Sequence, residues 1–169
     1  MSTAPHSNHT AAESADADAR QSAARALHPS GRHSRALDAG VLVAIAEGLA
    51  TVVDASESAA PGALRRTRLL DTSGYDAWLI VWGAGAVADD HDHAGSVGVV
   101  QVVAGTLTEV TADIDGGQDI KRTIDQSRSS ALAAIGRHTS ANHTTATCVS
   151  VHVYSPPLGE VDLADPEVI

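Results

Sequence analysis

"SVGVVQVVAGTLTEVTADI", residues 96–114, reads as two short strands rather than as one helix. Valine and threonine dominate the stretch, and β-branched side chains favour strands. Gly105 separates the two runs and predicts a tight hairpin between them. The stretch therefore predicts part of an antiparallel sheet.

Runs of the same kind lie on both sides of this stretch, separated by Gly, Asp or Asn. They are YDAWLIVWG (75–83), KRTID (121–125), SALAAI (130–135) and TATCVSVHVYS (145–155). Gly116 and Gly117 predict a second turn. Several short strands without helices between them indicate an all-β core, built as an antiparallel sandwich or barrel.

The pattern differs before this core. From Ser34 to about Ser56, apolar residues recur at helical spacing and predict an amphipathic helix; they are Leu37, Val41, Leu42, Ile45, Leu49 and Val52. Residues 1–33 are rich in Ala, Ser, Asp and His, offer little to bury, and are expected to form a disordered tail. Residues 34–169 then make a single domain with one or two leading helices.

Composition excludes several classes of function. The formal net charge of −10 argues against nucleic-acid and anionic-membrane partners. The single cysteine, Cys148, excludes an intramolecular disulfide and a cysteine-based zinc or iron–sulfur cluster. We see no secretory signal, and the longest apolar run (41–53) is interrupted by Glu47 and too short to span a bilayer. A soluble cytoplasmic protein is expected.

The segment "DDHDHAGSVG" (89–98) carries the first candidate ligands. His91 and His93 are spaced by two residues, so on a strand their imidazoles would share one face. A second segment provides His138 and Asn142. Two ligands from one strand and one from another would assemble a three-ligand site with open positions. Three histidines suit iron, zinc, nickel or copper, so the ligands alone leave the metal open.

The spacing of these residues is specific. Gly85-x5-His91-x-His93, then x11 and Gly105, followed downstream by His-x3-Asn, resembles the two motifs of the cupin superfamily. Most cupins carry a glutamate ligand five residues after the second histidine, where this chain has Gly98. Absence of this glutamate ligand is characteristic of the cysteine dioxygenase family. The chain resembles bacterial members of that family over about residues 64–158. WGAGAVADDHDHAGSVGVVQVVAGTLTE (82–109) and SVHVYSPP (150–157) carry this resemblance.

The resemblance implies a cupin-type β-barrel and a ferrous ion, Fe(2+), held by His91, His93 and His138. It implies an enzyme that uses O2 to convert L-cysteine to cysteine sulfinic acid. Animal members link a cysteine to the active-site tyrosine. Gly98 stands at that cysteine position, so this chain cannot form the thioether.

Ser150, His152 and Tyr154 alternate along one predicted strand and therefore share a face. Three polar groups on a buried face are costly unless they bond one another or serve a ligand. They match the family's serine–histidine–tyrosine relay. By that resemblance Tyr154 directs its hydroxyl at oxygen or substrate, His152 orients Tyr154, and Ser150 holds His152.

A carboxylate-bearing thiol needs a cation near the metal, and arginine suits a two-oxygen acceptor. The family's carboxylate-binding arginine lies on the strand before the one that leads to Trp-Gly-x-Gly. That region is RRTRLLD (65–71), in which Arg68 matches best. Arg66 shares its strand face by parity and is the second candidate, whereas Arg65 points the opposite way.

Two alternatives stay open. A dioxygenase for another small thiol, such as 3-mercaptopropionate or cysteamine, would keep the ligands and change the carboxylate or amine contacts. A non-catalytic cupin would bind a metal or small ligand without consuming oxygen. The expected partners are a small thiol amino acid and O2, in a monomer or small homo-oligomer.

Overall fold

The computed structural model describes residues 36–93, 95–112, 118–127, 129–132 and 137–158. The predicted tail (1–33) and the predicted turn at Gly116 and Gly117 lie outside these residues. The described elements are one helix, α2 (Ala39–Ala50), and the strands β1 (Leu64–Asp71), β2 (Asp76–Trp82), β3 (Val87–His91), β4 (Val97–Ala104), β5 (Leu107–Thr111), β6 (Ile120–Ile124), β7 (Ser130–Leu132), β8 (His138–Ala141) and β9 (Cys148–Ser155).

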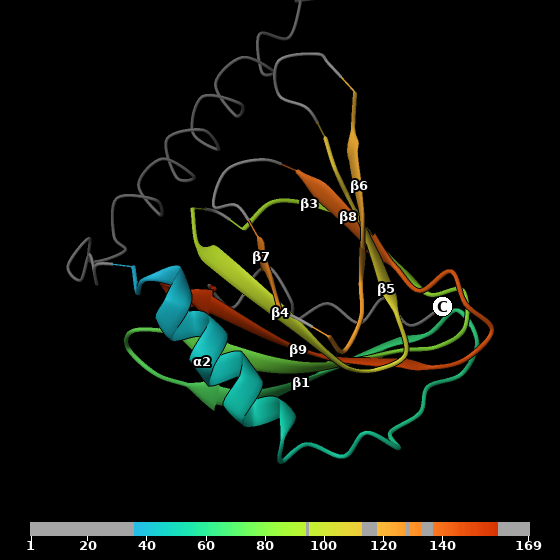
Figure 1. Ribbon diagram of the computed structural model, residues 1–169, viewed down its shortest axis with the longest axis horizontal. Coiled ribbons are helices and arrows are strands. Elements are labelled where there is room, and N and C mark those ends of the chain that lie inside the picture. Colours follow the sequence, from blue (N-terminus) through green and yellow to red (C-terminus); the bar gives the residue numbers. More distant parts are fainter. Residues whose placement is uncertain (1–35, 94, 113–117, 128, 133–136, 159–169) are drawn as a thin grey trace, which may run out of the picture. The chain divides into compact units, whose positions relative to one another are not determined.

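The strands form two antiparallel sheets. One has the order β1-β2-β9-β4-β7 and the other the order β3-β8-β5-β6 (Figure 1). Cupins are double-sheet folds of this antiparallel type. The prediction of an all-β, cupin-type core is confirmed, and the hydrogen bonds join the described strands into two sheets rather than one closed sheet.

The inner core lies between the two sheets. The first sheet contributes Trp78, Ile80 and Trp82 from β2, with neighbours on β4 and β9, and the second contributes Ala88, Leu107 and Ile124. Because the chain has no phenylalanine, the two tryptophans are the bulkiest apolar side chains of this core. They share one face of β2, since successive side chains on a strand alternate.

Helix α2 covers the other face of the first sheet (Figure 1). Leu42 and Ala46 are fully buried against the outward side chains of β2, β4 and β9. Asp38 caps the helix by accepting a hydrogen bond of 2.8 Å from the backbone N–H of Gly40. The helix spans 39–50 rather than the predicted 34–56. Within the described part of the chain, no helix is both long and apolar enough to cross a membrane.

Gly105 does not form the predicted hairpin. Strands β4 and β5 belong to different sheets, so the chain crosses between the sheets at this residue. Gly105 has φ +78°, and a Cβ there would lie 2.8 Å from the carbonyl oxygen of Thr147. Gly105 does separate the two strands, as predicted, but the pairing partner of each strand is non-local and is set by packing in the core.

Candidate metal centre

Three histidines converge at one end of the second sheet. His91 is the last residue of β3, His138 is the first residue of β8, and His93 follows β3 by two residues. One ring nitrogen from each lies within 4.8 Å of the others. The ring centroids are 4.5 Å apart for His91 and His138, and 4.6 Å apart for His93 and His138. This spacing lets a single ion contact all three imidazoles.

Strand pairing brings the distant segments together. His91 and His138 are direct partners across β3 and β8, after a register irregularity that follows Ala88. Arg137 reinforces the pairing of β3 with β8. Its Nε donates to Asp90 Oδ2 at 2.6 Å, and its Nη2 donates to the Asp90 carbonyl at 2.5 Å. The ion pair thus joins the two residues that directly precede the paired histidines.

His93 reaches the cluster by a route that the sequence did not predict. Strand β3 ends at His91, so the prediction that one strand carries both histidines is wrong. The carbonyl of His93 accepts a hydrogen bond of 2.9 Å from the N–H of Ser96 in the turn that follows. His93 and His138 are buried, whereas His91 is half-buried.

The ring nitrogens of His91 and His138 suit metal binding. The carbonyl of Asp89 can only accept, so Nδ1 of His91 donates to it at 2.6 Å, which leaves Nε2 as the ring nitrogen that could face a metal. Burial, followed by the proximity of His91, lowers the pKa of His138 to about 4. His138 is therefore neutral at pH 7. A neutral imidazole such as that of His138 is a ligand that suits a divalent transition ion.

A chain of buried hydrogen bonds lies beside the cluster. Ser150 Oγ is 2.9 Å from His152 Nε2, and His152 Nδ1 is 3.1 Å from the Tyr154 hydroxyl. Trp82 Nε1 donates to Ser150 Oγ at 2.8 Å. The Tyr154 ring lies 4.7 Å from the ring of His93, which connects the chain to the histidine cluster.

Burial also sets the charge states of His152 and Tyr154 in this hydrogen-bonded network. Burial and the nearby histidines lower the pKa of His152 to about 3, so its imidazole is neutral at pH 7. Burial raises the pKa of Tyr154, the Asp76 carboxylate raises it further, and the positive charge of Arg66 opposes both effects. Tyr154 is therefore a protonated phenol that can donate a hydrogen bond.

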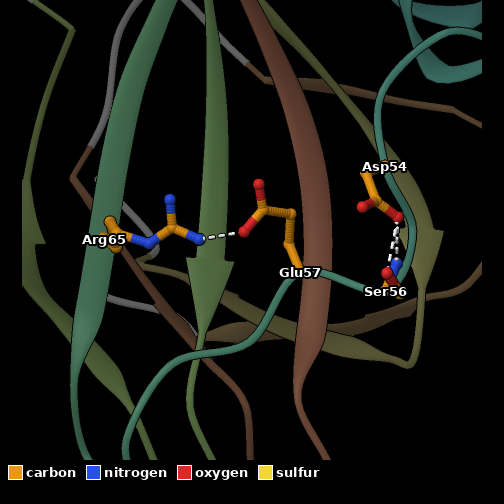
Figure 2. A network of polar contacts seen from close by, with 4 residues as sticks. All are labelled: Asp54, Ser56, Glu57 and Arg65. Carbon is orange, nitrogen blue, oxygen red and sulfur yellow. Dashed lines mark hydrogen bonds and ion pairs between the residues drawn. The ribbon is translucent and has the colours of Figure 1, made fainter.

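The three arginines of β1 have different surroundings. Arg66 and Arg68 point inward, and Arg66 lies close enough to Tyr154 and Asp89 to interact with both electrostatically. Arg68 donates from Nη1 to Asp71 Oδ2 at 2.9 Å, and its guanidinium lies 4.6 Å from the centre of the Trp78 ring. Arg65 points outward, as expected from parity, and pairs with Glu57 (Figure 2).

Sequence reasoning gave no role to two further polar residues. Asp76 is fully buried, pairs with Tyr154 across β2 and β9, and accepts a hydrogen bond of 3.0 Å from Trp78 Nε1. Glu109 is also buried and pairs with Arg122 at 3.2 Å. Strand parity could have placed Asp76 on the inner face, because it is two residues from Trp78.

Asn142 has a structural explanation. Its side-chain amide donates to the carbonyls of Trp82 and Gly83, both at 3.1 Å, and of Ala146 at 2.7 Å. Its side-chain oxygen accepts from Thr144. Asn142 therefore ties the loop after β8 to the end of β2, which explains an asparagine four residues after a candidate ligand.

Comparison with known families gives one match that covers more than half of the chain. The model of the family described as cysteine dioxygenase type I matches residues 62–165. This range includes all three histidines, the Ser150–Tyr154 strand and both inward arginines. Among curated proteins, no sequence matches the chain.

Solved structures give the fold. The TT1209 protein of Thermus thermophilus is similar with a TM-score of 0.52 and 14% identity, over 64% of this chain and 94% of that one. An oxalate oxidase in complex with the substrate analogue glycolate has a TM-score of 0.54 and 17% identity, over 64% of this chain and 59% of its own. At such low identities the likeness concerns the fold alone.

Proposed function

The chain belongs to the cysteine dioxygenase type I family, and on that premise we propose that it is a ferrous iron-dependent thiol dioxygenase. The proposed reaction oxidises L-cysteine with O2 to cysteine sulfinic acid. Both oxygen atoms of O2 become bonded to the sulfur, so the thiol is oxidised as dioxygen is reduced and no further reductant is needed. The observation that carries the proposal is the three-histidine cluster in contact with Tyr154.

His91, His93 and His138 would hold the iron. When bound, the iron would supply the electron transfer between the substrate sulfur and dioxygen, which side chains cannot perform. The residues around it would position the reactants. Tyr154 would donate a hydrogen bond to a molecule bound beside His93, and His152 and Ser150 would hold the phenol in place.

The substrate carboxylate requires a cation, and we propose Arg66 rather than Arg68 for this contact. Arg66 acts on Tyr154 through its charge, whereas Arg68 is already paired with Asp71 and rests on the ring of Trp78. Arg66 would therefore bind the carboxylate in a planar, two-oxygen contact. The sequence motif alone favours Arg68, with Arg66 as the second candidate. The proposed assignment to Arg66 reverses that order.

Two neighbouring activities share these ligands. A dioxygenase of 3-mercaptopropionate would need the arginine but no amine contact, and one of cysteamine would need no arginine. A non-catalytic cupin would bind a metal or a small ligand and consume no oxygen. A cytoplasmic location and a monomeric or small homo-oligomeric state remain part of the proposal.

Oxygen consumption by the iron-loaded protein tests the proposal. L-cysteine, 3-mercaptopropionate and cysteamine would be compared in an oxygen electrode, with product identified by mass. We expect uptake with L-cysteine and a product heavier by two oxygen atoms. The His138→Ala variant is the control and should lose most of its bound iron while retaining a folded core. No uptake with any of the thiols by protein of full iron content would contradict the proposal.

A further inference from the structure

We propose that Trp82 is a positioning residue, whose indole N–H sets the direction of the hydrogen bonds through Ser150 and His152 to Tyr154. This direction leaves the phenol proton available to a molecule bound beside His93. The hydrogen-bond direction itself follows from the structure, whereas its consequence for turnover rests on the proposed function.

The chain of hydrogen bonds begins with a group that can act in one way only. An indole N–H donates and never accepts, so Ser150 Oγ is the acceptor of the 2.8 Å bond from Trp82. Trp82 and Ser150 are 2% and 0% exposed, so solvent water cannot take the place of this donor. One end of the chain is therefore polarised by a donor on β2.

Ser150 has a single proton and two acceptors within reach. His152 Nε2 lies at 2.9 Å and the carbonyl oxygen of Ile80 at 3.5 Å. A hydroxyl normally donates over 2.5–3.0 Å, roughly, so the bond to His152 is much the stronger. A hydroxyl that accepts one hydrogen bond also becomes a better donor, so the bond from Trp82 strengthens this preference.

The tautomer of His152 follows from the hydrogen bond that Ser150 donates to it. Since Nε2 accepts from Ser150, the ring proton resides on Nδ1 and is donated to the Tyr154 oxygen at 3.1 Å. His152 is neutral at pH 7, which makes the two tautomers alternatives. Tyr154 accepts from His152 and retains its own proton for another acceptor.

If the hydrogen bonds ran in the opposite direction, the Tyr154 proton would be donated to His152. Ser150 would donate to Ile80, His152 would donate from Nε2 to Ser150, and Tyr154 would donate to Nδ1. Tyr154 would then have no proton to offer a substrate. The indole N–H of Trp82 favours the productive direction without touching the substrate, the metal ligands or Tyr154.

The first experiment reads the tautomer directly. Nitrogen-15 NMR of protein labelled in its histidines distinguishes a protonated ring nitrogen from one that carries a lone pair. We expect Nδ1 of His152 to be protonated in the wild type. Trp82→Phe keeps the aromatic ring and removes the N–H, and it should shift His152 toward the Nε2-protonated form.

Trp78→Phe is the matched control. Trp78 lies on the same strand and face, but its N–H donates to Asp76 and not to the chain of hydrogen bonds. This variant should leave the His152 tautomer unchanged. A wild-type protein with the proton on Nε2 would overturn the inference, even if Trp82→Phe fails to fold. An unchanged tautomer in a folded Trp82→Phe protein would do the same.

The second experiment measures turnover in a double-mutant cycle. Trp82→Phe should lower kcat about tenfold, as expected for one lost hydrogen bond, with KM and iron content unchanged. In a Ser150→Ala background the same substitution should have almost no further effect, because Trp82 acts through Ser150. Equal losses in both backgrounds would overturn the inference. Failure of the proposed function would instead appear as a wild-type protein that oxidises no thiol, which leaves the NMR result intact.

Discussion

Arg66 and Arg68 show how two identical side chains on one strand face acquire different surroundings. They are separated by one residue on β1 and both point inward, and the charge of Arg66 acts on Tyr154. Arg68 is held by Asp71 and Trp78. Neighbouring groups, rather than residue type, distinguish the proposed substrate contact, Arg66, from the ion-paired Arg68.

Replacing Arg66 with Ala should therefore raise KM for L-cysteine by roughly tenfold to a hundredfold, which corresponds to one lost charge-assisted hydrogen bond. Any activity toward cysteamine, which has no carboxylate, should change little. Steady-state oxygen uptake measures both. Arg68→Ala is the matched control and should have a much smaller effect. A larger increase in KM for Arg68→Ala would return the carboxylate-binding role to Arg68.

The connection between β4 and β5 shows why these elements lie in different sheets. Strand β4 pairs with β9 and β7, whereas β5 pairs with β8 and β6. The chain changes sheet at Gly105, where φ is +78° and the backbone passes close to Thr147. A side chain here would require both a left-handed backbone and the displacement of a neighbouring carbonyl.

Gly105→Ala should therefore lower the free energy of unfolding by about 1–3 kcal/mol. Equilibrium denaturation with urea measures the change. Gly48→Ala is a control that should stabilise the protein instead. Gly48 lies within α2, and nothing lies within 4 Å of the added Cβ. That variant should gain about 0.5–1 kcal/mol from helix propensity. A Gly105→Ala protein as stable as the wild type would show that the crossing tolerates a side chain.

The buried histidines connect the stability of the whole domain to pH. In the unfolded chain a histidine has a pKa near 6.5, whereas in the folded protein the pKa of His152 is about 3 and that of His138 is about 4. Below pH 6.5 the unfolded state binds these protons first. The stabilisation that comes from burying these two neutral imidazoles is therefore fully present above pH 6.5. It is lost as the pH falls toward the folded-state pKa values.

We expect the free energy of unfolding of metal-free protein to fall between pH 6.5 and 5 by up to about 1.4 kcal/mol for each pH unit and each such histidine. Urea denaturation in the presence of a chelator, repeated across this range, measures the slope. His152→Gln removes one of the titrating groups and should give a shallower slope than the wild type. Parallel slopes would contradict the assignment of His152 as a buried neutral group.

Local patterns in the sequence were enough to predict the all-β core and the shared face of Ser150, His152 and Tyr154. The period of two along a strand is a property of the backbone itself and needs no information from elsewhere in the chain. The same rule placed Arg66 and Arg68 together and Arg65 on the opposite side, as observed. The motif spacing also selected the three histidines that the structure brings together.

Contacts between distant segments could not be predicted in this way. The partner of each strand, the end of β3 at His91 and the crossing at Gly105 depend on how two sheets bury a common core. The different neighbours of Arg66 and Arg68, and the bond from Trp82 to Ser150, join residues on separate strands. Such pairings arise from the summed packing of the whole domain, because many registers satisfy the local pattern and only the assembled core distinguishes them.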